Sequence, residues 1–66
     1  MGLMVRLINK QGQRKEVHLI DGRCVHLGKF HPQKKNHISD PLEKSLLPPA
    51  VLDMAKRGNL IIEEVK

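Results

Sequence analysis

The sequence predicts an α+β fold, with a small antiparallel sheet of three to four strands and one C-terminal helix packed on it. Short segments of alternating polarity, separated by glycine-containing turns, predict the sheet. Prolines and a glycine bound an amphipathic stretch near the C-terminus, and this pattern predicts the helix. The alternative is that the sheet closes into a small barrel. With 66 residues, we expect a single small domain, 1–66.

The first strand is expected at 3–8, where Leu3, Val5 and Leu7 form one apolar face and the second face is partly apolar. The polar segment 9–13 follows it and contains Gly12, which can adopt positive φ at little cost. We expect a second strand at 16–20 to complete a hairpin with the first.

The dipeptide Asp21-Gly22 predicts a second hairpin, leading to a third strand. A three-residue loop at 20–22, with Gly22 left-handed at a bulge, pairs Val17 with Val25. We favour this register because it gathers the apolar residues on one face, whereas a two-residue loop splits them between both faces. The apolar face then consists of Val17, Leu19, Val25 and Leu27.

Residues 28–46 show no periodicity and are expected to form a long basic loop. Local signals predict a short helical turn at 41–46 within it. Asp40 is a suitable N-cap, Pro41 suits the first helical position, and Glu43 completes a capping box.

The C-terminal helix is expected to begin at Pro48 and Pro49 and to end at Gly58, which suits the left-handed conformation. Its apolar side chains form one broad arc: Leu47, Val51, Leu52, Met54 and Ala55. The last strand, 60–65, has charge on both faces and suits a sheet edge. We expect Val51, Leu52, Met54 and Ala55 to cover the strand residues Leu3, Val5, Leu7, Val17, Leu19, Val25 and Leu27.

Residues 46–65 (LLPPAVLDMAKRGNLIIEEV) resemble the C-terminal part of small accessory proteins encoded in the structural gene clusters of tailed phages and prophages. Those proteins also tend to run through strand, glycine turn, strand, short helix, glycine and a terminal apolar strand. The resemblance implies a non-enzymatic assembly protein that binds a larger virion component. The chain departs from that pattern in its long basic loop at 29–37.

The formal net charge of +5 favours a different class of partner, a polyanion. Much of the positive charge lies at 10–15 and at 23–37, and the second segment contains no acidic residue. The alternative function is therefore a small basic nucleic-acid-binding module, in which Phe30 offers a stacking surface. Its candidate binding residues are Arg23, Lys29, Phe30, Lys34 and Lys35. The competing interpretation is a solvated loop on a basic protein.

Three side chains that bind soft or borderline metals share the second face of the second hairpin. The favoured register sets His18 opposite Cys24, and Glu16 opposite His26, on this face. These residues, His18, Cys24 and His26, are candidate zinc ligands. Their spacing matches no standard zinc module. The competing interpretation is that Cys24 is a small buried hydrophobe and the histidines line a wet sheet face, and we predict no cofactor.

Catalysis is not predicted. Ser39 and Ser45 lack a glycine elbow, and Cys24 falls in a predicted strand rather than at a helix N-terminus. A single cysteine fits a reducing compartment, and we expect neither a signal peptide nor a membrane-spanning run. The preferred prediction is a cytoplasmic, non-enzymatic module that binds a protein partner. Self-association stays open because so small a core is expected to be marginally stable.

Overall fold

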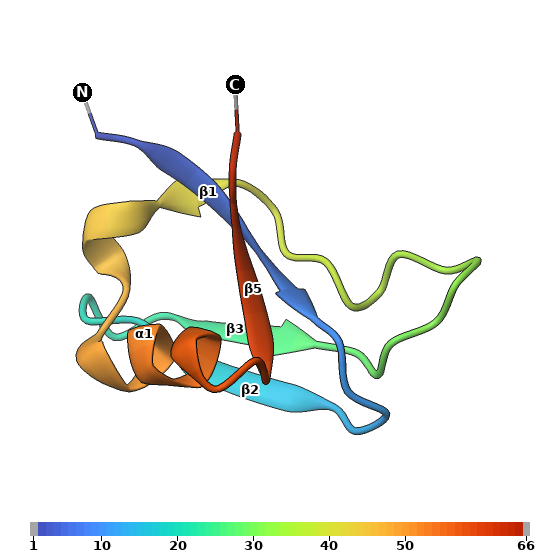
Figure 1. The fold of residues 1–66 in the computed structure, drawn as a ribbon. Helices are drawn as coiled ribbons and strands as arrows, with labels where there is room; N and C mark the ends of the chain where they lie inside the picture. The colour runs from blue at the N-terminus through green and yellow to red at the C-terminus, as the bar shows by residue number, and fades with distance from the viewer. Residues whose placement is uncertain (1, 66) are drawn as a thin grey trace.

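The protein folds as two antiparallel sheets and one α-helix (Figure 1). The computed structural model describes residues 2–65, so the two end residues of the predicted domain 1–66 lie outside the described residues. The elements in chain order are β1 (Met4–Asn9), β2 (Lys15–His18), β3 (Cys24–Leu27), β4 (Leu42–Glu43), a 3₁₀ turn (Lys44–Leu46), α1 (Pro49–Lys56) and β5 (Leu60–Glu64). β1 is the central strand of the sheet β4-β1-β5, and β2 pairs with β3 in a separate sheet. The predicted α+β fold class is confirmed, and the strands within residues 2–65 do not close into a small barrel.

The predicted hairpin between the first two strands is wrong. β1 pairs instead with β5, with Ile62 opposite Leu7 and Ile61 opposite Ile8. A hairpin would have set the polar segment 13–16 opposite this apolar end of β1. Cross-strand apolar pairs stabilise a sheet more than apolar–polar ones, so the distant β5 is the better partner.

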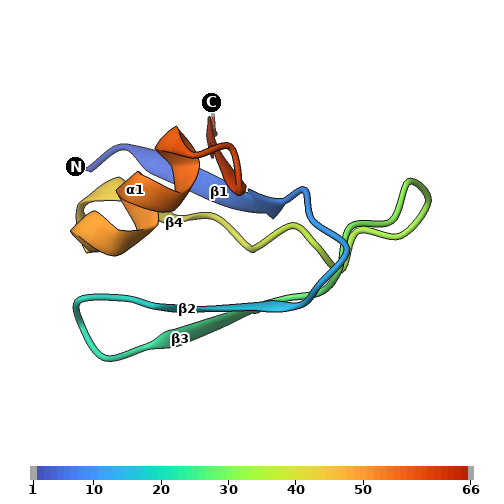
Figure 2. The same ribbon diagram turned by 60° about the horizontal axis from the view of Figure 1, so that its bottom comes forward.

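The second hairpin has the predicted register. Val17 lies opposite Val25. Gly22 adopts a φ of 95°, and the Leu19 N–H donates a hydrogen bond to the Arg23 carbonyl at 2.8 Å, which closes the predicted bulged loop. One face of this hairpin therefore packs into the core and the other faces solvent. Figure 2 shows β2 and β3 as a layer apart from β1, β4 and α1.

The segment after the basic loop adds to the free edge of β1, where β4 pairs antiparallel. Just before β4, the buried Ser39 hydroxyl accepts a hydrogen bond from the Leu7 N–H at 2.8 Å and donates one to the Asp40 carbonyl at 3.0 Å. The predicted helical turn at 41–46 is therefore wrong in its first half, and only Lys44–Leu46 is helical, as a 3₁₀ turn. Pairing with β1 satisfies backbone groups that an open strand edge would leave free, and it overrides the local capping signal.

The helix α1 has the predicted boundaries. Pro49 is its first residue, and Gly58, with a φ of 80°, follows its C-cap. The Gly58 N–H donates to the Ala55 carbonyl at 3.1 Å, and the Asn59 N–H donates to the Met54 carbonyl at 3.0 Å. These are the paired hydrogen bonds of a Schellman motif, which ends the helix and turns the chain into β5. No helix within residues 2–65 has the length and apolar character needed to cross a membrane.

The core lies between the two sheets, with α1 at its side (Figure 2). Its buried apolar residues are Val5, Leu7, Val17, Leu19, Leu27, Leu42, Leu47, Val51 and Leu60. Two predicted core residues are exposed instead, Leu3 at 44% and Leu52 at 40%. α1 is short and buries only Val51, so it covers less of the strands than expected. Leu42 and Leu60, the first residues of β4 and β5, complete the core.

Asn9, at the end of β1, joins the two layers through a fully buried side chain. Its Nδ2 donates to the Gln13 carbonyl at 2.7 Å and to the Gly28 carbonyl at 2.9 Å. Its Oδ1 accepts a hydrogen bond from the Gln11 N–H at 3.0 Å. These bonds shape the turn after β1 and tie it to the end of β3. They replace the turn conformation predicted at Gly12, which does not adopt positive φ.

Replacing Asn9 with alanine is expected to lower the free energy of unfolding by about 2 to 4 kcal/mol, because two carbonyls and one N–H lose their hydrogen-bond partner in a buried site. Urea denaturation followed by circular dichroism measures this loss. Asn36→Ala is the matched control, since Asn36 is exposed. Equal stability of the two variants would contradict the role assigned to Asn9.

Replacing Gly58 with alanine is expected to cost about 1 kcal/mol of stability, because an L-residue is strained at positive φ. A Cβ at this position would meet nothing within 4 Å, so the loss reports backbone conformation alone. Gly12→Ala is the control: its Cβ also meets nothing within 4 Å, but its φ is not positive. The thermal unfolding midpoint of Gly58→Ala should fall clearly below that of Gly12→Ala, and the reverse order would refute this explanation.

Candidate functional site

A basic groove opens between the turn after β1 and the loop after β3. Its volume is about 470 Å³, and its cationic lining residues are Arg14, Lys29 and Lys34. The other lining residues are Gly12, Gly28, His31 and Asn36, so no carboxylate is among them. Cations that converge on one concave surface without a neutralising acid create a positive potential. The basic groove is therefore a candidate binding site for an anion.

A close backbone contact at the base of the loop shapes the basic groove. The Gly28 N–H donates to the Asn36 carbonyl at 2.8 Å. A Cβ on Gly28 would lie 3.0 Å from the Asn36 Cβ and 3.2 Å from its carbonyl oxygen, so a larger residue would need Asn36 to move by a few tenths of an ångström. The Asn9 amide also holds the Gly28 carbonyl. Both ends of the loop are thus fixed near the end of β1, and its middle projects from the body of the protein (Figure 1).

His31 organises the tip of this loop. Its Nδ1 accepts hydrogen bonds from the backbone N–H groups of Gln33 at 3.1 Å and Lys34 at 3.2 Å. These bonds turn the chain back on itself after His31. Lys29 and Lys34, which precede and follow the turn, both line the basic groove as a result.

Phe30 packs at the edge of the loop and keeps part of its ring exposed. Its N–H donates to the Gln11 carbonyl at 2.9 Å. Its ring meets the buried His37 ring edge-on, with centroids 4.9 Å apart, and the Lys10 Nζ lies 5.0 Å from its centroid. The ring is 38% exposed, so it offers a partial stacking surface beside a further cation.

The predicted nucleic-acid-binding residues divide between two places. Lys29 and Lys34 line the basic groove, Phe30 packs beside it, and Lys35 is exposed on the same loop without lining the groove. Arg23 directly precedes β3, at the end of that strand opposite to the loop, and its Nε contacts the Asp21 carboxylate at 2.6 Å. The structure therefore does not bring Arg23 together with the loop lysines.

Arg14 is the cationic groove residue that the sequence prediction missed. It belongs to the basic segment 10–15, which was noted only for its charge. That charge was the available signal, but the pairing of β2 with β3 is what brings this segment to the base of the loop.

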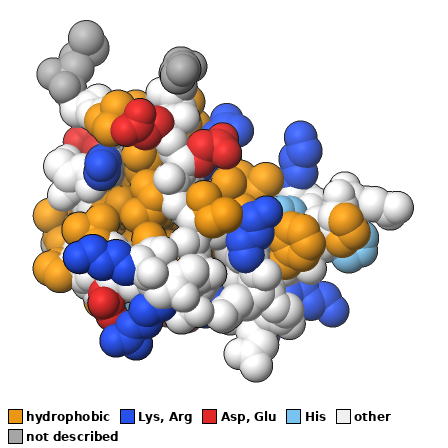
Figure 3. Space-filling model, viewed as in Figure 1, with side chains coloured by type: hydrophobic (Ala, Val, Ile, Leu, Met, Phe, Trp, Pro, Cys, Tyr) orange, Lys and Arg blue, Asp and Glu red, His pale blue; other side chains and the backbone are white. Residues whose placement is uncertain are grey.

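The end of the molecule with the projecting loop differs in charge from the body, because no acidic side chain is visible there on the face shown in Figure 3. On the face shown in Figure 3, the end with the projecting loop carries Lys, Arg and His side chains and exposed apolar groups. The acidic side chains visible on that face lie on the body of the protein, where further Lys and Arg side chains accompany them (Figure 3). An anionic partner would therefore be attracted toward the loop.

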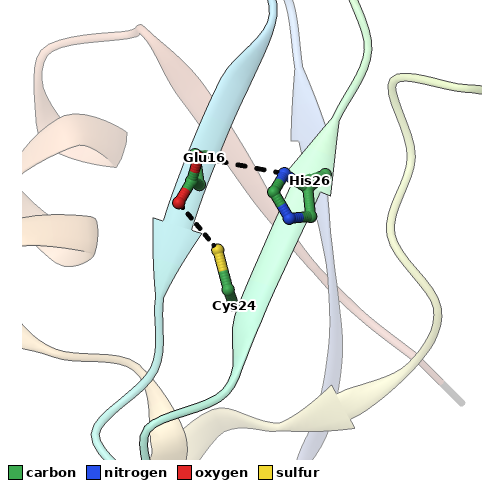
Figure 4. Close-up of side chains that lie close together, drawn as sticks. All are labelled: Glu16, Cys24 and His26. Atoms are coloured by element: carbon green, nitrogen blue, oxygen red, sulfur yellow. Dashed lines mark hydrogen bonds and ion pairs between the residues drawn. The ribbon is translucent and has the colours of Figure 1, made fainter.

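A second cluster of polar side chains lies on the solvent face of the β2–β3 hairpin (Figure 4). The Cys24 Sγ donates a hydrogen bond to Glu16 Oε1 at 3.1 Å, and His26 Nδ1 lies 3.9 Å from Glu16 Oε2. One potential ligand atom from each of these three residues lies within 4.8 Å of the others. His18 Nε2 lies 3.3 Å from Glu16 Oε1, but His18 is not part of that mutually close group.

The structure thus brings two of the predicted metal ligands, Cys24 and His26, together with Glu16, which sequence reasoning had not chosen as a ligand. The predicted register already set Glu16 opposite His26, and this was the available signal. All three residues are exposed, including Cys24, so the interpretation of Cys24 as a small buried hydrophobe is wrong.

Hydrogen bonding between Cys24 and Glu16 shifts the pKa of both groups. The bond from the thiol, and the nearby His26 and His18, lower the pKa of the Glu16 carboxyl. The same bond raises the pKa of the Cys24 thiol, with the Glu16 charge adding to the effect. A raised pKa keeps Cys24 in its thiol form at neutral pH, so this arrangement does not activate it as a nucleophile.

Comparison with protein-family models, curated proteins and solved structures finds no match to this chain. Its function is therefore argued from its own residues, and membership of the phage accessory proteins stays a prediction.

Proposed function

We propose that the protein is a non-enzymatic nucleic-acid-binding module whose basic groove holds backbone phosphates. One observation carries this proposal: Arg14, Lys29 and Lys34 line a groove that has no acidic residue in its lining. Guanidinium and ammonium groups bind phosphate through charge-assisted hydrogen bonds, and arginine does so in a bidentate way. The positive charge of the lining favours phosphate over an uncharged ligand.

Single-stranded nucleic acid is the form that the loop suits best. A partly exposed aromatic ring next to cations allows one base to stack while the neighbouring phosphates enter the basic groove. Phe30 is that ring, and Lys10 lies over it. A duplex hides its base faces, so it would gain only the electrostatic part of the interaction.

Replacing Lys29 and Lys34 together with alanine is expected to weaken binding of a fluorescently labelled single-stranded oligonucleotide about tenfold at physiological salt. Each lost phosphate contact should also reduce the salt dependence, the slope of log K against log salt, by about 0.7. Fluorescence anisotropy titrations at several salt concentrations measure both effects. A labelled duplex of the same sequence should bind more weakly than the single strand.

The matched control is the double variant Lys44→Ala/Lys56→Ala, which removes two exposed positive charges outside the basic groove. It should keep nearly wild-type affinity. If both double variants lose affinity equally, net charge rather than the groove drives binding, and the proposal fails. Wild-type binding that disappears as soon as salt is raised to the physiological range would also contradict it.

Replacing Gly28 with alanine should weaken oligonucleotide binding several-fold while all groove cations remain. The added Cβ would lie 3.0 Å from the Asn36 Cβ, so Asn36 would have to move by a few tenths of an ångström, which disturbs the base of the loop. Gly12→Ala is the control, because Gly12 also lines the groove but its Cβ would meet nothing within 4 Å. Unchanged affinity in Gly28→Ala would show that the loop geometry is irrelevant to binding.

Protein binding in assembly is the second candidate function, supported by the outer face of the sheet β4-β1-β5. Met4, at 37% exposed, Ile8 and Ile61, at 40% exposed, lie on this face, which points away from the core. The resemblance to phage accessory proteins suggests a virion component as the partner. We propose the cytoplasm as the location of this protein. Docking through apolar side chains should be nearly insensitive to salt and should survive the loss of Lys29 and Lys34.

A further inference from the structure

The solvent face of the β2–β3 hairpin places a carboxylate, a thiol and an imidazole within reach of one small ion (Figure 4). Glu16 and His26 face each other across the two strands, and Cys24 lies two residues along β3 from His26 on the same face. Backbone pairing fixes these positions, so the cluster does not depend on loop conformation.

The separations within the cluster approach those of a tetrahedral zinc site. In a tetrahedral site with one sulfur ligand, zinc bonds of about 2.0 Å to nitrogen or oxygen and about 2.3 Å to sulfur place the ligand atoms about 3.3 to 3.5 Å apart. The Cys24 Sγ lies 3.1 Å from one carboxylate oxygen of Glu16, Oε1, and His26 Nδ1 lies 3.9 Å from the other, Oε2, while one ligand atom from each of the three residues lies within 4.8 Å of the others. Small side-chain rotations, which exposed residues make freely, bring these distances into that range.

The donor set selects among metals. A thiolate, an imidazole and a carboxylate together suit Zn²⁺, whereas Mg²⁺ and Ca²⁺ prefer oxygen ligands alone. His18 adds a second imidazole at the edge of the cluster, with its Nε2 3.3 Å from Glu16 Oε1 and its side chain 74% exposed. It is therefore placed to supply a fourth ligand after rotation of its side chain.

We propose that Glu16, Cys24 and His26 bind one Zn²⁺ ion on the exposed face of the β2–β3 hairpin, with His18 as the fourth ligand. On binding, the Cys24 thiol releases its proton to solvent and its sulfur bonds to the metal. The ion then links two strands that form a sheet of their own, and a two-stranded sheet is marginally stable without such support. This site is independent of the basic groove and of nucleic-acid binding.

Cobalt titration of the full, reduced protein tests the site directly, because tetrahedral Co²⁺ reports its ligands in the optical spectrum. We expect one equivalent of Co²⁺ to produce a thiolate-to-metal charge-transfer band together with the intense visible bands of tetrahedral coordination. One equivalent of Zn²⁺ should abolish both. A chromophoric chelator in competition then measures zinc affinity.

Three variants assign the ligands: Cys24→Ser, His26→Ala and Glu16→Gln. Cys24→Ser should lose the charge-transfer band, and each variant should bind zinc at least about tenfold more weakly than the wild type. Zinc should raise the thermal unfolding midpoint of the wild type but not that of Cys24→Ser, since binding to the folded state alone stabilises it. Glu63→Gln is the matched control, because Glu63 is an exposed carboxylate on β5 in the other sheet, and it should bind like the wild type.

Several outcomes would overturn the proposal. These are a cobalt spectrum without a thiolate band, zinc affinity unchanged in Cys24→Ser and His26→Ala, or one ion bound per two chains, which would place the metal between copies. Far-ultraviolet circular dichroism of each variant accompanies the titration, and because the three residues are exposed we expect each variant to keep the wild-type spectrum. His18→Ala tests the fourth ligand, and an unchanged cobalt spectrum in that variant would remove His18 from the site.

Discussion

The buried amide of Asn9 is the polar contact on which the arrangement of the two sheets depends. It bonds to three backbone groups, in Gln11, Gln13 and Gly28, so the end of β1, the turn that follows and the end of β3 meet at one point. Apolar contacts are non-directional and would not by themselves fix how the end of β1 lies against the end of β3. Because the amide is fully buried, each of its hydrogen bonds must be present for the core to close around it.

The hydrogen bonds of Asn9, which hold the turn after β1 against the end of β3, explain why the protein has two sheets instead of one. The turn after β1 leads the chain away from that strand, which leaves both edges of β1 free for β4 and β5. The β2–β3 hairpin then packs by one face only, through Val17, Leu19 and Leu27. Its other face stays in solvent, and this is where Glu16, Cys24 and His26 gather (Figure 4).

Both candidate sites depend on the pairing of β2 with β3. Arg14 directly precedes β2 and Lys29 lies just after β3, so the hairpin brings the two sides of the basic groove together. The zinc site proposed here draws its ligands from the same two strands. The structure thus concentrates its chemistry on one hairpin and the loop that follows, while β1, β4, β5 and α1 provide the core that supports them.

The sequence by itself determined the features that depend on local backbone conformation. The bulged turn at Gly22, the start of α1 at Pro49 and its end at Gly58 follow from the φ angles that these residues favour. The shared face of Cys24 and His26 follows from the two-residue alternation of side chains along a strand. Only the tertiary structure decided the partners of β1, the exposure of Leu52 and the entry of Arg14 into the basic groove. These features depend on contacts between segments far apart in the chain, where several pairings satisfy the local pattern equally well and burial chooses among them.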